Sequence, residues 1–398
     1  MTWANAMAET YDVIVVGGGP AGATTAQLTA KSGAQVLLLD RGGRIKPCGG
    51  AVPPRLIRDY DIPQDLIVAR IDAARIVSPT GRLAHMPVEG SYVGMVDRKD
   101  FDEYLRDRAA KAGATRQTGT YTKSSRDDDG TLRIHYVMKN GEENSARTKL
   151  AIGADGALSK LGRDHIADAH KTRLVFAYHE IVERPGEADT YSSDRCDVYY
   201  NARYSPDFYA WVFPHGKTAS IGTGSAHKGF ALRDAVAKLR KDAGLEGNKT
   251  LRKEGAPIPL KPLKRWDNGR DVLLAGDAAG VVAPASGEGI YYAMLGGELA
   301  ADTALAFLQS GDARVLAEAR KRFMRAHGMI FRVLAVMQHF WYGNDARRER
   351  FVSMCRDKDV QRLTWAAYTE KKLQKAGATA HARIFFKDMA HLLGIVAP

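Results

Sequence analysis

The stretch Tyr11–Asp40, YDVIVVGGGPAGATTAQLTAKSGAQVLLLD, decides the fold. An apolar β-branched run enters a glycine cluster, a helix of small residues follows, and a second apolar run ends on Asp40. This order is typical of a βαβ unit that binds a dinucleotide. Gly17 permits the tight turn, Gly19 lets the main chain approach a pyrophosphate, and Gly22 lets the helix pack close to the strand. We therefore expect a pyrophosphate at the helix N-terminus and a ribose hydroxyl on Asp40.

The size and charge of the chain limit the classes of partner. A chain of 398 residues suits two closely packed domains with a helical appendage. Lys and Arg number 58 against 46 Asp and Glu, and the formal net charge of +12 favours an anionic partner such as a diphosphate or an acidic lipid surface. The basic residues are scattered and accompany no nucleic-acid module, so we expect no nucleic-acid partner. A generally basic, soluble surface explains the charge equally well.

The cysteines and the apolar pattern indicate the compartment. Cys48, Cys196 and Cys355 are odd in number and far apart, which fits neither a disulfide framework nor a metal site and suits a reducing cytoplasm. Residues 1–10 lack the pattern of a signal peptide. No run of about 18 apolar residues occurs, so we expect no spanning helix. The expected location is cytoplasmic, with peripheral contact to a membrane surface as the alternative to a freely soluble protein.

The rest of the chain divides into strand-rich and helix-rich parts. Alternating apolar and polar residues predict strands over residues 75–96, 115–152 and 173–225. Helical spacing predicts helices over residues 97–112, 231–243 and onward from 312. A second strand, a Gly-Asp turn and another small-residue helix fill Asp271–Ala301.

Three motifs in combination resemble the fingerprints of the para-hydroxybenzoate-hydroxylase-like FAD proteins. GxGxxG lies near the N-terminus, Asp155-Gly156 follows a buried apolar run, and Gly276-Asp277 precedes a PxxGxG loop. The resemblance implies FAD as the cofactor. Asp277 would hold the ribityl chain, and the open main chain at 287–289 could donate N–H groups to the flavin N1/O2 locus.

A second resemblance concerns the substrate half of the chain. Cys48-Gly49-Gly50 matches a Cys-x-Gly motif, and Tyr209-x-Trp211-x-Phe213-Pro214 matches a YxWxFP motif, of the geranylgeranyl reductases. The resemblance is closest to the geranylgeranyl diphosphate and geranylgeranyl-(bacterio)chlorophyll reductases. Strand alternation puts Tyr209, Trp211 and Phe213 on one face, where they would line an apolar pocket. Plain core packing is the alternative, and for Phe213 it is the better interpretation.

These patterns predict an α/β fold (α+β overall): a Rossmann-like FAD-binding domain, an interleaved antiparallel-sheet substrate domain and a C-terminal helical region. The FAD-binding domain is expected at 1–75, 97–172 and 266–310, the substrate domain at 76–96 and 173–265, and the helical region at 311–398. The expected cofactor contacts are Gly17, Gly19, Ala21, Gly22, Asp40, Arg41, Cys48, Gly49, Arg98, Asp155, Gly276, Asp277, Pro284, Gly287 and Gly289. Arg98 stands where the family has an arginine before a helix, and a surface arginine is its alternative interpretation. No metal site is expected.

The implied reaction is the hydrogenation of C=C bonds in a geranylgeranyl chain to phytyl, in bacteriochlorophyll or chlorophyll synthesis. An isolated alkene is a poor hydride acceptor, so a proton donor must act while positive charge grows on the tertiary carbon. Cys48 is the candidate donor, although a tyrosine or a water could replace it, and the faces of Tyr209 and Trp211 would stabilise the charge. The substrate would be a geranylgeranylated pigment or geranylgeranyl diphosphate. Because only one GxGxxG is present, NADPH would bind transiently, or reduced ferredoxin would replace it.

Two other functions share some of these features. A flavin-dependent aromatic monooxygenase would carry the same cofactor fingerprints but would consume oxygen. A non-catalytic isoprenoid carrier could keep FAD for structure alone. The Cys-Gly-Gly loop and the aromatic motif favour the reductase over the monooxygenase, and reoxidation of the photoreduced flavin by a geranylgeranyl substrate without oxygen would exclude the carrier.

Overall fold

The computed structural model describes residues 9–43 and 45–371. The chain forms two compact units, each built from three separate segments. The first unit comprises Met1–Lys46, Lys99–Leu174 and Pro257–Arg332, and the second comprises Pro47–Arg98, Val175–Ala256 and Val333–Pro398. The expected division by function therefore remains a prediction, with 47–75 belonging to the second compact unit.

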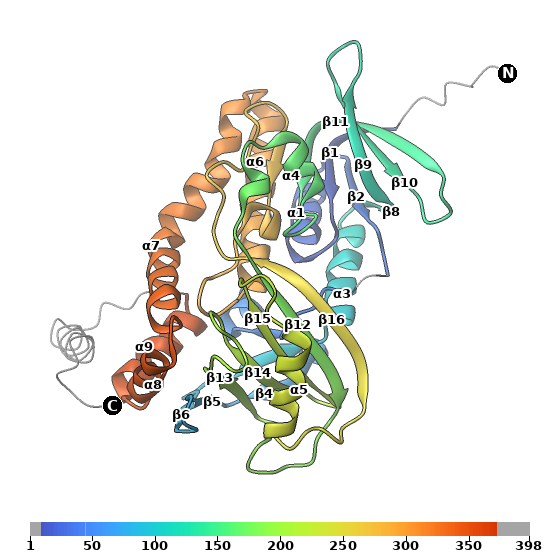
Figure 1. Cartoon of the computed structure of the whole chain (residues 1–398). Coiled ribbons are helices and arrows are strands. Elements are labelled where there is room, and N and C mark those ends of the chain that lie inside the picture. Colours follow the sequence, from blue (N-terminus) through green and yellow to red (C-terminus); the bar gives the residue numbers. More distant parts are fainter. Residues whose placement is uncertain (1–8, 44, 372–398) are drawn as a thin grey trace. The chain divides into compact units, whose positions relative to one another are not determined.

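A seven-stranded sheet forms the centre of the first unit (Figure 1). The strand order is β8-β2-β1-β11-β10-β9, and β17 also pairs with β11. Strands β8, β2, β1, β11 and β17 are parallel, whereas β10 and β9 are antiparallel to their neighbours. The strands are β1 (Thr10–Val16), β2 (Val36–Asp40), β8 (Thr115–Thr118), β9 (Thr120–Arg126), β10 (Leu132–Val137), β11 (Glu143–Gly153) and β17 (Val272–Leu274).

The burial pattern explains where each strand lies in this sheet. Val13, Ile14 and Val15 are all fully buried, as a central parallel strand covered on both faces requires. In β10 the buried residues alternate with partly exposed ones, because one face of this antiparallel part is open to solvent. The glycine turn that follows β1 is therefore held at the end of a strand whose last four residues are buried.

Helices α1 and α6 approach each other closely in the first unit. A Cβ atom on Gly297 would lie 2.3 Å from the Ala21 carbonyl oxygen, and Thr25 Oγ1 donates to the Gly297 carbonyl at 3.0 Å. Small residues thus let the two helix backbones touch, and this brings both helix N-termini to the same end of the unit. The helical elements here are α1 (Pro20–Lys31), α3 (Arg98–Lys111), α4 (Lys160–His165), η2 (Ala169–Lys171), η3 (Gly276–Ala279), α6 (Ile290–Ser310), η4 (Ala313–Leu316) and the first part of α7 (Ala317–Trp341).

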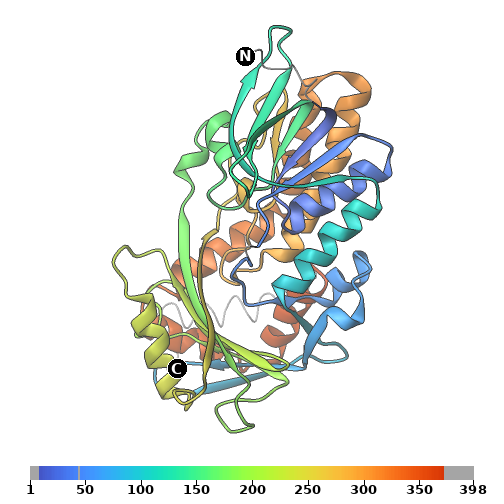
Figure 2. The same cartoon turned by 90° about the vertical axis from the view of Figure 1, so that its right-hand side faces the viewer.

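The second unit contains another seven-stranded sheet, in the order β16-β12-β15-β14-β13-β5-β6, and a small sheet β3-β7-β4. Helix α5 lies along the larger sheet (Figure 2), where Val236 and Leu239 pack with Val182 and Ile221. The larger sheet consists of β5 (Ala73–Val77), β6 (Leu83–Pro87), β12 (Leu174–Glu183), β13 (Arg195–Tyr199), β14 (Ala210–His215), β15 (Thr218–Ser225) and β16 (Thr250–Pro259). The other elements are β3 (Ala51–Val52), α2 (Pro54–Asp59), η1 (Gln64–Leu66), β4 (Ile67–Ile71), β7 (Val93–Val96), α5 (Leu232–Asp242), α8 (Asp345–Met354) and α9 (Lys358–Thr369).

The predicted fold class is confirmed. The expected helices over 97–112 and 231–243 are α3 and α5, and the strands expected over 173–225 are β12 to β15. The buried apolar run before Asp155-Gly156 is the end of β11, which stops at Gly153 because the chain turns there into the loop that precedes α4. The helical pattern expected beyond 312 is present as far as Thr369, whereas its remainder and the signal-peptide question for 1–8 lie outside the described residues.

Candidate functional site

The glycine turn after β1 has the geometry that a pyrophosphate site requires. Gly17 has φ +108°, and a Cβ atom there would lie 2.3 Å from the Ala154 carbonyl oxygen. A Cβ on Gly22 would lie 1.8 Å from the Gly17 carbonyl oxygen, so only glycine lets α1 begin this close to the turn. By contrast, a Cβ on Gly19 would meet nothing within 4 Å, which leaves open space beside the main chain. A pyrophosphate fits that space.

The N-termini of helices α1 and α6 lack side-chain caps. Gly19 caps α1 and Gly289 caps α6, and neither helix has an acidic residue in its first turn. The first N–H groups of a helix have no partner within the helix and carry a partial positive charge. Both ends therefore suit an anion, such as the pyrophosphate at α1 and the pyrimidine oxygen of a reduced flavin at α6.

Asp40 lies directly beside the glycine turn. Its two carboxylate oxygens accept hydrogen bonds from Gly18 N and Gly42 N, each at 2.8 Å. These backbone donors hold the carboxylate at the end of β2, where it could accept a ribose hydroxyl. Arg41, the next residue, is exposed.

Asp277 carries an ion pair that the sequence did not indicate. Its side chain is 6 % exposed and pairs with the ammonium group of Lys46, which is 231 residues away in the chain. A buried carboxylate needs such a partner because desolvation penalises an isolated charge. Gly276 precedes it with φ +61°, and a Cβ there would lie 2.6 Å from the Cβ of Ala21. Ala21 and Gly276 thus keep η3 close to α1.

The PxxGxG loop adopts a strained conformation before α6. Ala285 has φ +63°, which is uncommon for a residue with a side chain, and Gly287 has φ +66°. Such strain costs on the order of 1–3 kcal/mol and persists where the surroundings hold it in place. Pro284 is buried next to it, and the loop ends at Gly289. The loop presents main chain rather than side chains at the start of α6.

The carboxylate of Asp155 is used by the protein itself. It accepts hydrogen bonds from Ser159 Oγ and from Lys160 N, the latter at 2.7 Å, and so caps α4. Burial raises the pKa of the Asp155 carboxyl, and these donors oppose the shift. These bonds shape the turn after β11, and contact of Asp155 with the cofactor stays a prediction.

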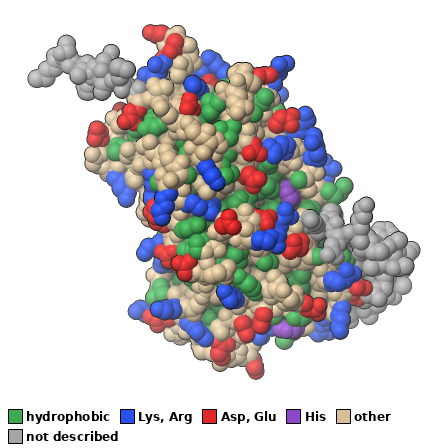
Figure 3. All heavy atoms as spheres, turned by 180° about the vertical axis from the view of Figure 1, so that it is seen from behind, with side chains coloured by type: hydrophobic (Ala, Val, Ile, Leu, Met, Phe, Trp, Pro, Cys, Tyr) green, Lys and Arg blue, Asp and Glu red, His purple; other side chains and the backbone are tan. Residues whose placement is uncertain are grey.

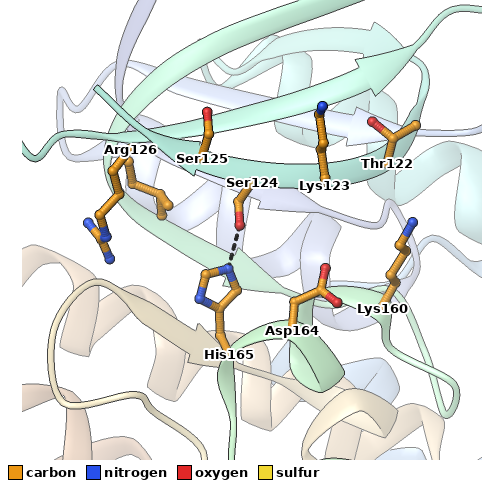
Figure 4. A pocket seen from close by; sticks show the side chains of 9 residues that line it. Thr122, Lys123, Ser124, Ser125, Arg126, Lys160, Asp164 and His165 are labelled. Carbon is orange, nitrogen blue, oxygen red and sulfur yellow. Dashed lines mark hydrogen bonds between the residues drawn. The ribbon is translucent and has the colours of Figure 1, made fainter. Parts of the chain in front are cut away.

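A separate pocket of about 510 Å³ lies beside β9 and α4 (Figure 4). Ser124 and His165 point toward each other across it and are joined at 2.7 Å, while Lys123 points to the other side of β9 (Figure 4). Arg126 binds Asp271 through two hydrogen bonds of 2.7 and 2.9 Å. These polar groups are largely satisfied by one another, and no predicted cofactor contact lines the pocket. We therefore do not place the cofactor there.

In the second unit the Cys48 loop packs against the YxWxFP strand. A Cβ on Gly49 would lie 3.2 Å from the Phe213 ring, and one on Gly50, which has φ +75°, would lie 2.4 Å from His215 Nε2. Cys48 is a partly buried free thiol whose Sγ accepts from Gly50 N at 3.4 Å. Glycines at both positions bring the loop, and hence Cys48, onto β14.

Arg98 begins α3 and is only 6 % exposed. The surface interpretation of this arginine is therefore wrong, because a surface guanidinium would be largely hydrated. Contact with the flavin remains a prediction.

The aromatic side chains of β14 belong to a longer row. Ring centroids are 6.0 Å apart for Tyr209 and Trp211, 6.1 Å for Trp211 and Phe213, and 6.1 Å for Tyr200 and Tyr209. Tyr342 extends the row through a hydroxyl contact of 3.0 Å with Tyr200. We call Tyr342, Tyr200, Tyr209, Trp211 and Phe213 the aromatic row. The sequence predicted the last three, whereas Tyr200 lies just after β13 and Tyr342 lies just after α7, so neither belongs to the alternation of β14.

Burial fixes the protonation of two groups near this row. It raises the pKa of Tyr209 above the usual phenol value, so the hydroxyl stays protonated. It lowers the pKa of His215 from 6.5 to about 4, and a hydrogen bond with the Phe213 carbonyl oxygen opposes this shift only in part. His215, which sequence reasoning did not single out, is therefore neutral near pH 7.

Comparisons with known proteins agree with this arrangement. The profile of the FAD binding domain family matches residues 64–322, and that of the NAD(P)-binding Rossmann-like domain matches residues 15–56. A "Geranylgeranyl diphosphate reductase" from Rhodobacter capsulatus is 56% identical over 388 residues, covering 98% of this chain and 99% of the relative. The chain belongs to the geranylgeranyl diphosphate reductase family.

A similar reductase is found in plants, and one solved structure has a similar fold. A chloroplastic geranylgeranyl diphosphate reductase from Arabidopsis thaliana is 35% identical over 91% of this chain and 80% of its own length. A geranylgeranyl bacteriochlorophyll reductase-like crystal structure from Thermoplasma acidophilum superimposes with a TM-score of 0.81 at 22% identity, covering 95% of this chain and 99% of the other. This last likeness concerns the fold alone. The match to the FAD binding domain shows FAD as the cofactor, and its contacts with the glycine turn and Asp277 stay predictions.

Two glycine substitutions separate cofactor binding from folding. We expect Gly22→Ala to prevent stable folding, because its methyl group would collide with the Gly17 carbonyl. Gly19→Ala should fold normally, since its methyl enters open space, but FAD affinity should fall at least about tenfold where the methyl meets the pyrophosphate. Flavin absorbance per protein and thermal melting of the apoprotein measure the two effects. Normal FAD affinity in Gly19→Ala would contradict this placement of the pyrophosphate.

The neutral state of His215 predicts a pH-dependent stability. Unfolded histidine binds a proton below about pH 6.5, whereas buried His215 does so only near pH 4. The stability that neutral His215 contributes is fully present above pH 6.5 and is lost as the pH falls toward 4. This loss lowers the free energy of unfolding by at most about 3 kcal/mol. In His215→Gln the slope of the unfolding free energy over this window should be smaller. Denaturant titrations of both proteins at pH 7 and pH 5 measure it, and equal slopes would disprove the assignment.

Proposed function

We propose that the protein is an FAD-dependent reductase that saturates the C=C bonds of a geranylgeranyl chain to give phytyl. The observation that carries this proposal is the packing of the Cys48-Gly49-Gly50 loop on the YxWxFP strand, in a chain of this family. The loop brings a thiol to a row of aromatic rings, which suits an apolar, alkene-containing substrate. A flavin-dependent monooxygenase would need neither feature.

The first unit would hold FAD through main chain and two carboxylates. The pyrophosphate would lie on the N–H groups at the start of α1, a ribose hydroxyl on Asp40 and the ribityl chain on Asp277. The N–H groups at the start of α6 would face the pyrimidine edge of the flavin. FAD supplies the hydride when it is bound and reduced. Arg98 is also proposed to contact the flavin.

The side chains of the second unit would supply the rest of the chemistry. Reduction of an isolated alkene requires a proton at one carbon while the other becomes electron-deficient. Tyr209 and Trp211 present aromatic faces, which stabilise a nearby desolvated cation by about 2 kcal/mol. The Cys48 thiol carries a transferable proton and lies in the loop that packs on Phe213 and His215, so we propose it as the donor.

The electron donor must act without a second dinucleotide domain. The NAD(P)-binding profile matches residues 15–56, which is the same glycine turn that FAD needs. NADPH would therefore bind transiently beside the flavin, or reduced ferredoxin would deliver electrons. The substrate is proposed to be a geranylgeranylated (bacterio)chlorophyll or geranylgeranyl diphosphate, in pigment biosynthesis, and both share the chain that the aromatic row would contact.

The substrate also suggests contact with a lipid surface. A chain of about 20 carbons gains on the order of 15 kcal/mol on leaving water, so it is best taken directly from a membrane or a pigment. No helix among the described residues is long and apolar enough to span a membrane. Lys and Arg are intermixed with Asp and Glu on the face seen in Figure 3, so surface charge alone does not single out a docking site there.

Helix α7 carries the best candidate for such contact. Met329, Val333 and Val336 are 60 %, 41 % and 67 % exposed and share one helix face by their spacing. Arg325 and Arg332 are exposed within the same face. This combination suits the surface of an anionic bilayer, and we propose a cytoplasmic protein that docks through this face.

Anaerobic turnover tests the proposed reaction. With NADPH or reduced ferredoxin, the enzyme should convert geranylgeranyl diphosphate or the geranylgeranylated pigment to products heavier by 2, 4 and 6 mass units, because each saturated bond adds two hydrogens. Product masses measure this directly. Cys48→Ala should bind FAD normally and lose about 10²-fold or more in turnover. Oxygen-dependent hydroxylation without chain reduction would favour the monooxygenase, and full activity in Cys48→Ala would remove its acid role.

Vesicle binding tests the α7 face. Met329→Glu combined with Val336→Glu should reduce cosedimentation with phosphatidylglycerol vesicles severalfold, because two charges replace apolar contacts. The matched control is Leu158→Glu with Leu251→Glu, which changes two other exposed apolar residues of 53 % and 46 % exposure. Equal binding by both double variants would refute the docking face.

A further inference from the structure

A chain of buried hydrogen bonds crosses four neighbouring strands of the second unit and ends on Trp211. Trp211 Nε1 donates to Ser220 Oγ at 3.0 Å, and Ser220 Oγ is 2.9 Å from His179 Nδ1. His179 Nε2 lies 2.9 Å from Glu254 Oε2. These residues come from β14, β15, β12 and β16, which are adjacent in the sheet. Ser220, His179 and Trp211 are 0 %, 3 % and 6 % exposed.

The donors and acceptors in this chain fit one arrangement of hydrogens. An indole nitrogen can only donate, so Ser220 Oγ accepts from Trp211. If the Ser220 hydroxyl then donates to His179 Nδ1, the proton of a neutral imidazole lies on Nε2 and is donated to Glu254. Every polar atom from Trp211 to Glu254 is satisfied in this arrangement. Burial raises the pKa of Glu254, but the hydrogen bond from His179 and the charge of Arg252 oppose it, and the net shift is downward.

Arg252 continues the chain to the segment that enters α3. Its guanidinium lies 3.0 Å from Glu254 Oε1 and 3.9 Å from Asp97 Oδ2, and Asp97 precedes Arg98. The carboxylate of Glu254 is thus held from two sides, which gives the network a fixed anchor.

The same residue types form the triads of hydrolases, but this chain is not built for nucleophilic attack. Ser220 is fully buried, and its oxygen already accepts the Trp211 N–H. A nucleophile must instead present a free lone pair to a substrate. These hydrogen-bonded residues can therefore influence a substrate only through Trp211, the residue at the end of the network.

The Trp211 ring is fixed by packing as well as by this hydrogen bond. A Cβ atom on Gly222, the cross-strand partner of Trp211, would lie 2.2 Å from the indole ring and 2.6 Å from His179 Cβ. The indole therefore lies flat over Gly222, and its N–H can reach Ser220. Rotation of the ring about its side-chain torsions would leave the buried indole N–H without an acceptor, while Ser220 would keep only its hydrogen bond with His179, so the observed orientation is favoured.

We propose that Glu254, His179 and Ser220 are positioning residues that lock the Trp211 indole in one orientation within the aromatic row. The effect on the substrate rests on the proposed function, in which the isoprenoid chain lies against the aromatic row. There the fixed ring of Trp211 sets the shape of the surface that the isoprenoid chain contacts. Without these hydrogen bonds the Trp211 ring would adopt several orientations, and the surface would lose its defined shape although every aromatic side chain is still present.

Four single variants of the FAD-loaded protein test the lock. Ser220→Ala and His179→Phe break the chain at its centre with little change in volume, whereas His179→Gln keeps one acceptor and one donor. Ser124→Ala is the matched control, because it removes another serine–histidine hydrogen bond, of 2.7 Å to His165. The indole N–H signal of Trp211, assigned with Trp211→Phe, is followed by ¹H–¹⁵N NMR without substrate.

We expect Ser220→Ala and His179→Phe to shift or broaden the Trp211 signal and to lower kcat/KM for the geranylgeranyl substrate about tenfold, with FAD retained. In His179→Gln the Trp211 signal and kcat/KM should stay close to those of the wild type, and in Ser124→Ala both should be unchanged. An unchanged Trp211 signal in Ser220→Ala and His179→Phe would overturn the proposal, even if stability falls. Because the signal is read without substrate, this outcome differs from a failure of the proposed reaction, in which the wild-type enzyme would not reduce the chain.

Discussion

The first unit depends on the contact between the Gly17 carbonyl group and the main chain of Gly22. The distance leaves no room for even a methyl group, so the turn after β1 and the first turn of α1 form one rigid piece. That piece in turn fixes where α6 can pack, because Ala21 touches both Gly276 and Gly297. The proposed cofactor site is thus shaped by main-chain proximity, and the side chains of Asp40 and Asp277 are predicted to add to it.

Glycines also allow close contacts in the second unit, where they position side chains rather than a turn. Glycines at 49, 50 and 222 remove side chains where the Cys48 loop and the Trp211 ring must lie flat on the sheet. The result is a thiol loop, an aromatic row and a buried polar chain that all meet at β14. An apolar substrate offers few hydrogen bonds, so its position has to be set by the shape of such a surface.

The sequence predicted those features that are local in the chain. The glycine turn, the strand before Gly276 and the alternation of Tyr209, Trp211 and Phe213 each depend on residues within one segment, and their geometry follows from strand and turn rules. The partners of these residues could not be predicted in this way. Lys46 meets Asp277 across 231 residues, and Tyr342 meets Tyr200 across 142, so neither pair leaves a local pattern. The chain from Trp211 to Glu254 requires the order β14-β15-β12-β16, which a single sequence does not reveal. The burial of Arg98 could not be predicted from the sequence either, because it comes from packing rather than from its neighbours in the chain.

The division of each unit into three separated segments has a consequence for synthesis on the ribosome. The strands β1 and β2 emerge early, but β17 and α6, which complete the same unit, are made more than 200 residues later. At 5–20 residues per second, the early βαβ segment waits on the order of 10–50 s for its packing partners. During that interval the small-residue face of α1 lacks α6, its packing partner, so the first unit can be completed only after the chain has passed α6.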